Sequence, residues 1–277
     1  MITLQIEGSG AGGDRGKIFK AVPERPSVAR FHICGGQPPK LTSALFLAER
    51  MHLALVNLSA GSCVFTGCDS SHRPLQGHVH AYIFCECDPE RDGRGEITNI
   101  TVYARLGFGP RERAALESLD RIWGPGELEV DLALQKLGRP EDFRGCALFG
   151  KSQSWVSRTP FLSTRHAKRT RAGVPKYDDS GLQKGSPEHD LLRLLGVAGF
   201  PRPLKVEPVR GTILGGREVS WHAFLRRRER REGKQAADGN GYGFRIEFAE
   251  AVQGPVAVGA ESHFGMGGFV LFESENR

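Results

Sequence analysis

The sequence lacks the two kinds of segment that would direct the chain into or across a membrane. No apolar run approaches the roughly 20 residues that a bilayer-spanning helix needs. The first residues, MITLQIEGSGAGGDRGK, do not place a basic stretch before a long apolar one, which is the pattern of a secretory signal. We therefore expect a cytoplasmic protein with no membrane partner.

A paired zinc-ligand pattern is missing as well. The chain has six cysteines, and without an export signal we expect them to be reduced thiols. Cys63 and Cys68 are separated by four residues, and Cys85 and Cys87 follow, whereas zinc knuckles usually show two short pairs of ligands. The sequence therefore predicts no metal site and no cofactor.

The residues that are present fit a soluble globular protein, because 39% are apolar and 25% are charged. The net charge is +6, but it is unevenly distributed. Residues 1–150 contain 17 Lys and Arg against 18 Asp and Glu, whereas residues 151–277 contain 21 against 14. The positive excess of the second half indicates a polyanionic partner such as nucleic acid, with a solvated basic face as the alternative.

The predicted elements of the first half follow the order β-α-β-β-α-β. A β-like run at 28–33 precedes a helix over 44–58, which Thr42 or Ser43 can cap. The segments HVHAYIFCEC and ITNITVYARL read as a hairpin. PRERAALESLDRIW reads as a helix that starts at Pro110, and ELEVDLAL reads as the last strand. This order is typical of the ferredoxin-like fold.

The second half repeats this order less regularly. WVSRTPFLSTRH, VSWHAFLRRR, GYGFRIEFAEAV, GPVAVG and GGFVLF read as strands, and SPEHDLLRLLGVAGF reads as a capped helix. The polar, basic stretch between Arg165 and Gly185 reads as a mobile loop. We predict an α+β protein of two tandem ferredoxin-like (RRM-like) domains, residues 1–150 and 151–277, the second irregular with a C-terminal glycine-rich loop.

Two basic runs and a glycine-rich turn lie in the second half. FLRRRERREGK and RHAKRTRAG concentrate cationic groups that bind phosphate, and the glycines of GAESHFGMGGF allow backbone amides to approach an anion. Each feature alone is more often a solvated loop or an ordinary turn, but together they favour RNA or DNA contact. The aromatic-rich signature of an RNA-recognition motif is absent, so we expect contacts to the backbone rather than base stacking. The residues predicted to bind RNA are Arg165, His166, Lys168, Arg169, Arg226, Arg227, Arg228, Arg230, Arg231, His263, Gly265, Gly267 and Gly268.

Histidines are the candidates for acid–base chemistry, because the ordinary imidazole pKa is about 6.5. His78 and His80 alternate along a predicted strand and would share one face, where they could supply a base and an acid together. His52 lies on the flank of the apolar stripe of the first helix, where it can face a cleft. A hydrogen-bonded structural histidine is the alternative interpretation for each of them.

Four phrases, in a fixed order, carry a resemblance to a known family. They are GHVHAYIFCECDPERDGRGEITNITVYARLGFGPRERAALESLDRIW, TPFLSTRHAKR, PVRGTILGGREVSWHAFLRRR and GYGFRIEFAEAVQGPVAVGAESHFGMGGF. Together they resemble the CRISPR-associated protein of type I-G (formerly I-U) systems, in which a crRNA-capping subunit is fused to a repeat-processing endoribonuclease of the RAMP superfamily. The resemblance covers most of residues 28–273 and only the nuclease half, so we expect a separate processing subunit or a shortened protein.

The resemblance implies an activity in antiviral defence, namely metal-independent cleavage of CRISPR repeat RNA in precursor crRNA. The 2′-OH would attack, leaving a 2′,3′-cyclic phosphate and a 5′-OH, and the loop from Gly259 to Gly268 would touch RNA. Many members place the base in or beside the first helix, which is the position of His52. The predicted catalytic residues are therefore His52, His78 and His80. A non-catalytic crRNA-binding scaffold of a type I effector complex, or a structural partner of other effector subunits, is left open as the alternative.

Overall fold

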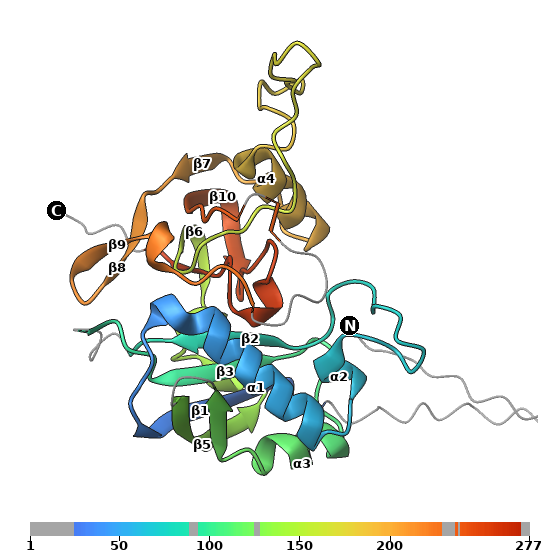
Figure 1. The fold of residues 1–277 in the computed structure, drawn as a ribbon, viewed down its shortest axis with the longest axis vertical. Helices are drawn as coiled ribbons and strands as arrows, with labels where there is room; N and C mark the ends of the chain where they lie inside the picture. Colours follow the sequence, from blue (N-terminus) through green and yellow to red (C-terminus); the bar gives the residue numbers. More distant parts are fainter. Residues whose placement is uncertain (1–24, 89–93, 125–127, 229–235, 238, 273–277) are drawn as a thin grey trace, which may run out of the picture.

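The computed structural model describes residues 25–88, 94–124, 128–228, 236–237 and 239–272 (Figure 1). Arg230 and Arg231, which the sequence predicts to bind RNA, lie outside these ranges. Within the described ranges, no helix combines the length and the apolar character needed to cross a bilayer. The chain forms two main antiparallel sheets, one in each half of the molecule, and a separate two-stranded hairpin.

The first sheet has the strand order β2-β3-β1-β5-β4, and all neighbouring strands are antiparallel. The βαββαβ order of the ferredoxin-like fold is formed by β1, α1, β2, β3, α3 and β5, and β4 is an additional edge strand. The elements are β1 (Val28–Gly36), η1 (Leu41–Ser43), α1 (Ala44–Leu58), α2 (Cys63–Thr66), β2 (Tyr82–Glu86), β3 (Asn99–Tyr103), α3 (Pro110–Glu117), β4 (Arg121–Gly124) and β5 (Leu128–Gly138).

Helix α1 forms where the apolar periodicity predicts it, and its stripe covers the sheet. Leu47, Met51 and Leu55 are fully buried and belong to the same core cluster as Phe31 of β1. Ser43 stands at the N-cap position, but its side chain makes no capping hydrogen bond, because the helix continues directly from the turn η1. Burial of the apolar side chains on this face therefore stabilises α1, by roughly 25 cal/mol for each Å² of apolar surface removed from water.

The second helix of this half is shorter by about two turns than the sequence predicts. α3 ends at Glu117, and β4 then pairs antiparallel with β5. Leu116 and Leu119 are buried as the helical pattern requires, but Trp123 is 67% exposed on the added edge strand. Pairing with β5 thus overrides the helical periodicity at this end of the segment.

The expectation that His78 and His80 alternate along a strand is also wrong. β2 begins only at Tyr82, and His78 has a left-handed backbone with φ of +50°. The chain turns before it enters the sheet, so the two histidines reach their positions from a loop rather than from one face of a strand.

The second sheet has the strand order β11-β6-β10-β7, again antiparallel throughout. This is the ferredoxin-like order, with a short 3-10 turn, η6, in place of the second helix and with the hairpin β8-β9 inserted. The predicted irregular second ferredoxin-like fold is confirmed. The elements are η3 (Pro140–Phe143), η4 (Ala147–Phe149), β6 (Lys151–Ser157), α4 (Pro187–Val197), β7 (Lys205–Pro208), β8 (Gly211–Leu214), β9 (Arg217–Ser220), η5 (Trp221–Ala223), β10 (Phe244–Gln253), η6 (Ser262–Phe264) and β11 (Phe269–Leu271).

Three predicted strands of this half differ from the structure. WVSRTPFLSTRH, residues 155–166, belongs to a strand only up to Ser157, where β6 ends. β9 ends at Ser220, and the turn η5 separates it from the arginine run. The buried Trp221 explains the turn, because its indole N–H donates to the Val209 carbonyl at 2.7 Å. GPVAVG forms no strand, although a bridge between Ala257 and Gly268 joins it to the residues just before β11.

Residues 165–185, here called the arm, project away from both sheets (Figure 1). Isolated bridges between Arg169 and Pro175 and between Tyr177 and Gln183 fold the arm back on itself. Its root adjoins α4, whose capping by Ser186 is confirmed, since the Ser186 hydroxyl accepts from the His189 amide. Mobility of the arm stays a prediction.

One hydrophobic core crosses the junction between the halves. Leu162, Trp221 and Met266 from the second half belong to the same buried cluster as the residues of α1 and the first sheet. A second cluster lies between α4 and the second sheet. The division into residues 1–150 and residues 151–277 stays a prediction, because the halves share this core.

Candidate functional site

Four histidines from three separate segments meet at the junction. His52 comes from α1, His78 and His80 from the loop before β2, and His263 from η6, which contacts both α1 and β2. Figure 1 shows the η6 region, near the end of the colour scale, facing α1 and β2. We call these four residues the histidine cluster. All three predicted catalytic residues belong to it, together with His263, which the sequence predicts only as an RNA contact.

His263 is the centre of the cluster. Its ring stacks between His80 and Tyr82, with centroid distances of 3.6 Å and 3.9 Å. Its Nδ1 atom lies 3.1 Å from the Ala81 carbonyl oxygen, and its Nε2 atom lies 3.2 Å from Nδ1 of His78. These contacts hold the ring by both faces and both nitrogens, so its orientation is fixed.

A charged pair adjoins the histidine cluster. Nε of Arg228 donates to Oε2 of Glu261 at 2.7 Å, and both side chains are largely buried, with exposed fractions of 15% and 6%. The guanidinium group also lies 4.5 Å from the ring centroid of Phe264, whose ring meets His52 edge-on at 5.0 Å. Arg228, one of the predicted RNA contacts, therefore brings a positive charge next to the imidazoles.

Burial keeps most of the histidine cluster neutral. It lowers the pKa of His52 to about 4, with a further lowering by Arg228, and it lowers the pKa of His80 to about 4, with a further lowering by His78. The pKa of His263 also lies well below its ordinary value because of burial. A phosphate group at this site would oppose these effects, since a nearby negative charge favours the protonated imidazole.

Imidazole rings of the histidine cluster stack on one another, and their nitrogen atoms do not converge on a single metal position. Among the described residues, no group of three or more His, Cys, Asp or Glu side chains is arranged to hold a metal ion. Independence from metal nevertheless stays a prediction about the reaction.

The three predicted RNA-binding glycines are packed inside the protein. The amides of Gly265, Gly267 and Gly268 donate to the Ser262 carbonyl, the Pro160 carbonyl and the Thr159 hydroxyl, respectively. Gly265 and Gly267 have left-handed φ values of +78° and +59°. A Cβ atom would lie 2.8 Å from the Ile83 carbonyl oxygen at Gly265 and would overlap the Val258 carbonyl oxygen at Gly267. These amides are not available to RNA in this structure, and close packing explains the glycines instead.

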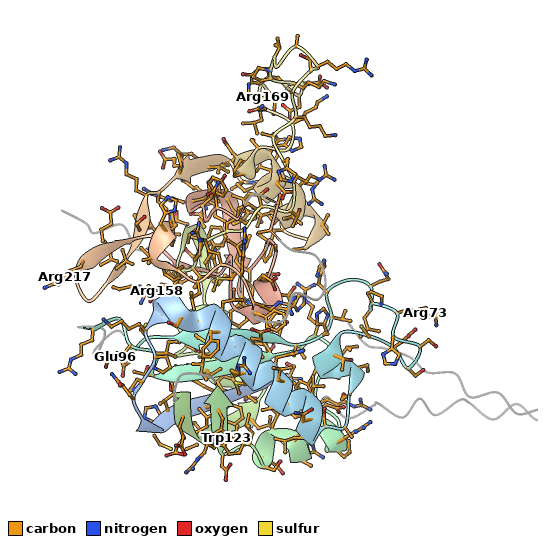
Figure 2. All side chains as sticks on the ribbon, in the orientation of Figure 1. Arg73, Glu96, Trp123, Arg158, Arg169 and Arg217 are labelled. Atoms are coloured by element: carbon orange, nitrogen blue, oxygen red, sulfur yellow. The ribbon has the colours of Figure 1, made fainter. Side chains whose placement is uncertain are left out.

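The predicted basic residues fall into two separate places. Arg165, His166, Lys168 and Arg169 are exposed on the arm, where Figure 2 shows Arg169 away from both sheets. Arg226, Arg227 and Arg228 follow η5. Arg227 is exposed, Arg226 is partly buried and Arg228 reaches the histidine cluster.

A buried carboxylate anchors the root of the arm. Oδ2 of Asp190 accepts from the Thr164 amide at 2.7 Å, and its Oδ1 accepts from Nη2 of Arg193 at 2.6 Å. Burial alone would raise the pKa of Asp190, but the hydrogen bonds from Arg193 and Thr164 outweigh it and hold the pKa below its ordinary value. The arm therefore leaves the body of the protein from a fixed point.

A cavity of about 320 Å³ lies between the halves, lined in part by Gly265 and Gly268. Arg30 and Glu86 form an ion pair of 3.5 Å in its wall, and the Cys146 thiol lies 3.2 Å from a Glu86 oxygen. The sequence does not predict this cavity, because its lining comes from short segments that lie far apart in the chain and share no motif.

Solved structures that resemble this one include three that cover most of the chain. A structure described as CRISPR associated protein Cas6 has a TM-score of 0.43 and 10% identity, over 89% of this chain and 98% of that chain. An RAMP protein binding different RNA substrates gives 0.39 and 13%, over 90% and 100%. A Cas6 product complex gives 0.38 and 16%, over 88% and 99%. No family model and no curated protein matches the sequence. Function is therefore inferred from the side chains of this chain itself.

Proposed function

We propose that this protein is a metal-independent endoribonuclease that cleaves CRISPR repeat RNA in precursor crRNA. The observation that carries the proposal is the meeting of His52, His78, His80 and His263 beside Arg228. Imidazoles and a guanidinium group can supply the functions that cleavage by an internal 2′-OH requires. In that reaction a base removes the hydroxyl proton, a donor protonates the departing 5′-oxygen, and a cation stabilises the charge on the phosphorane.

The basic surface supports RNA as the substrate. The arm presents Arg165, Lys168 and Arg169 to solvent, and the second half carries the positive excess of the chain. Cationic side chains of this kind bind the phosphate backbone without reading the base sequence. In our proposal the arm holds the repeat RNA while Arg228 and the histidine cluster engage the scissile phosphate.

The tandem ferredoxin-like folds and the ordered phrases of the sequence support a place among the crRNA-processing RAMP proteins. Within that group we propose the type I-G nuclease subunit, with residues 1–150 and 151–277 as its two domains. The protein would act in the cytoplasm, remain bound to its product and join other type I effector subunits.

Incubation with labelled repeat RNA in EDTA tests the activity. We expect one cut per repeat, with a 2′,3′-cyclic phosphate and a 5′-OH as the new ends. A matched RNA with a 2′-deoxy nucleotide at the cut site should bind equally well and stay intact, because the nucleophile is missing. Tight binding of repeat RNA without cleavage would overturn the enzyme proposal and support the scaffold alternative.

A further inference from the structure

Hydrogen bonding determines which nitrogens of His263 and His78 carry protons. Nδ1 of His263 faces the Ala81 carbonyl oxygen at 3.1 Å. A carbonyl oxygen can only accept, so Nδ1 of His263 must carry the hydrogen. Because burial keeps this ring neutral, its Nε2 atom has a lone pair and acts as an acceptor.

The same reasoning extends to His78. Nε2 of His263 lies 3.2 Å from Nδ1 of His78, so His78 must donate through Nδ1. A neutral His78 then has its lone pair on Nε2. His78 is exposed, and within the described part of the chain no side chain or backbone group hydrogen-bonds to its Nε2 atom. The chain of hydrogen bonds therefore ends in a lone pair on Nε2 of an exposed residue.

Several features keep this arrangement rigid. His263 is stacked between His80 and Tyr82, so it cannot turn to exchange its two nitrogens. His78 has φ of +50°, a conformation that costs free energy and is enriched at functional sites. The rings of His78 and His263 are nearly parallel, at 18°, an orientation that is compatible with a hydrogen bond between Nδ1 of His78 and Nε2 of His263.

We propose that Nε2 of His78 is the general base that takes the proton from the attacking 2′-OH, and that His263 is a positioning residue that fixes the tautomer of His78. This inference rests on the proposed endoribonuclease function. It differs from the assignment of the base to His52, which lies against Phe264 and makes no comparable relay with the described residues.

The reaction step balances with this assignment. The 2′-O–H bond breaks as its proton passes to Nε2 of His78, and the oxygen forms a bond to phosphorus. The bond between phosphorus and the 5′-oxygen then breaks, and that oxygen takes a proton from water. The imidazolium form of His78 keeps donating to His263 through Nδ1 and later returns the gained proton to solvent.

Nitrogen-15 NMR of the imidazoles tests the tautomers without any RNA. At a pH where the rings are deprotonated, we expect the hydrogen on Nδ1 in both His78 and His263, whereas free imidazole side chains favour hydrogen on Nε2. In His263→Phe, which keeps an aromatic ring between His80 and Tyr82, His78 should revert to the Nε2–H tautomer. A wild-type His78 with its hydrogen on Nε2 would overturn the inference.

Single-turnover cleavage tests the chemistry. His78→Asn suits this purpose because Asn tolerates a left-handed backbone but is not a base. We expect a rate loss of about 10²- to 10⁴-fold with unchanged RNA affinity, and a smaller loss, of at least about tenfold, in His263→Phe. His72→Asn is the matched control, since His72 is exposed in the same loop with φ of +58°, and it should keep the wild-type rate.

The outcomes separate this inference from the proposed function. If the wild type cleaves repeat RNA and His78→Asn cleaves it at the same rate, the role of His78 is overturned but the proposed function stands. A wild type that cleaves no repeat RNA would overturn both, whatever the NMR spectra show.

Discussion

At the scale of single residues, burial of the imidazoles makes the protein sensitive to acid. The folded-state pKa of His52 and of His80 is about 4, below the ordinary value of 6.5. The unfolded chain therefore binds more protons between these two values, so stability is lost as the pH falls from about 6.5 towards 4. Allowing for partial solvent exposure, we expect each histidine to cost about 1 kcal/mol of unfolding free energy between pH 7 and pH 5. Urea denaturation at both pH values measures the loss.

His80→Phe isolates one contribution to this acid sensitivity. Phenylalanine keeps the ring stacked on His263 but cannot be protonated. His78 and His263, which face His80, and Arg228, which faces His52, all remain in the variant. The loss of stability between pH 7 and pH 5 should shrink by about 1 kcal/mol. His166→Phe, at an exposed position on the arm, should leave this loss of stability unchanged. Equal acid sensitivity in both variants would contradict this explanation.

Arg228 has a structural role besides any contact to RNA. Arg228→Met would leave the carboxylate of Glu261 buried without the guanidinium group that pairs with it. Breaking a buried pair in this way typically costs about 3 kcal/mol of unfolding free energy. Arg227→Met, at the neighbouring exposed position, should change stability by no more than about 0.5 kcal/mol. Chemical denaturation of the two variants at pH 7 makes the comparison, and equal midpoints would count against the pairing.

At the scale of elements, the glycine-rich segment between β10 and β11 takes the place of a helix. Gly267→Ala should be strongly destabilising, by about 3 kcal/mol or more, because it adds an overlap with the Val258 carbonyl to the cost of a left-handed backbone. Gly173→Ala on the arm has a similar φ of +80° but open space around it, so it should cost only about 1 kcal/mol. Thermal unfolding distinguishes the two. Comparable losses of stability in the two variants would mean that the glycine-rich segment moves and so relieves the overlap with the Val258 carbonyl.

Elements governed by local pattern were predictable from the sequence. The apolar stripe of α1 and the capping serine of α4 mark their helices, and the β-α-β-β-α-β order gives the fold of the first half. β4 was not predictable, because its pairing with β5 depends on a neighbour in space and contradicts the helical pattern around Trp123. The close packing of Gly267 was not predictable for the same reason. Its amide bonds to the Pro160 carbonyl, more than 100 residues away in the sequence.

The site was predictable in composition but not in geometry. Imidazole chemistry, together with the family resemblance in the case of His52, indicates His52, His78 and His80 as catalytic candidates. Nothing local to the sequence, however, shows that His263 lies between them, since it is 185 residues from His78. The antiparallel second sheet returns the chain to the junction just before β11, and this return places η6 against β2. The tautomer of His78 depends on that contact.

At the scale of the whole molecule, the arm and the histidine cluster are distinct parts, so binding and cleavage should respond separately to substitution. Simultaneous replacement of Lys168, Arg169 and Arg171 by Gln should weaken binding of repeat RNA and leave the single-turnover rate at saturating protein unchanged. Each lost contact to a single-strand phosphate lowers the slope of log affinity against log salt by about 0.7, so three contacts lower it by about 2. Filter binding across a salt series measures the slope. A matched control removes three exposed arginines from the first half, namely Arg111, Arg113 and Arg121. An unchanged slope in the arm variant, or an equal change of slope in the control, would mean that RNA affinity depends on the net charge of the protein rather than on contacts from the arm.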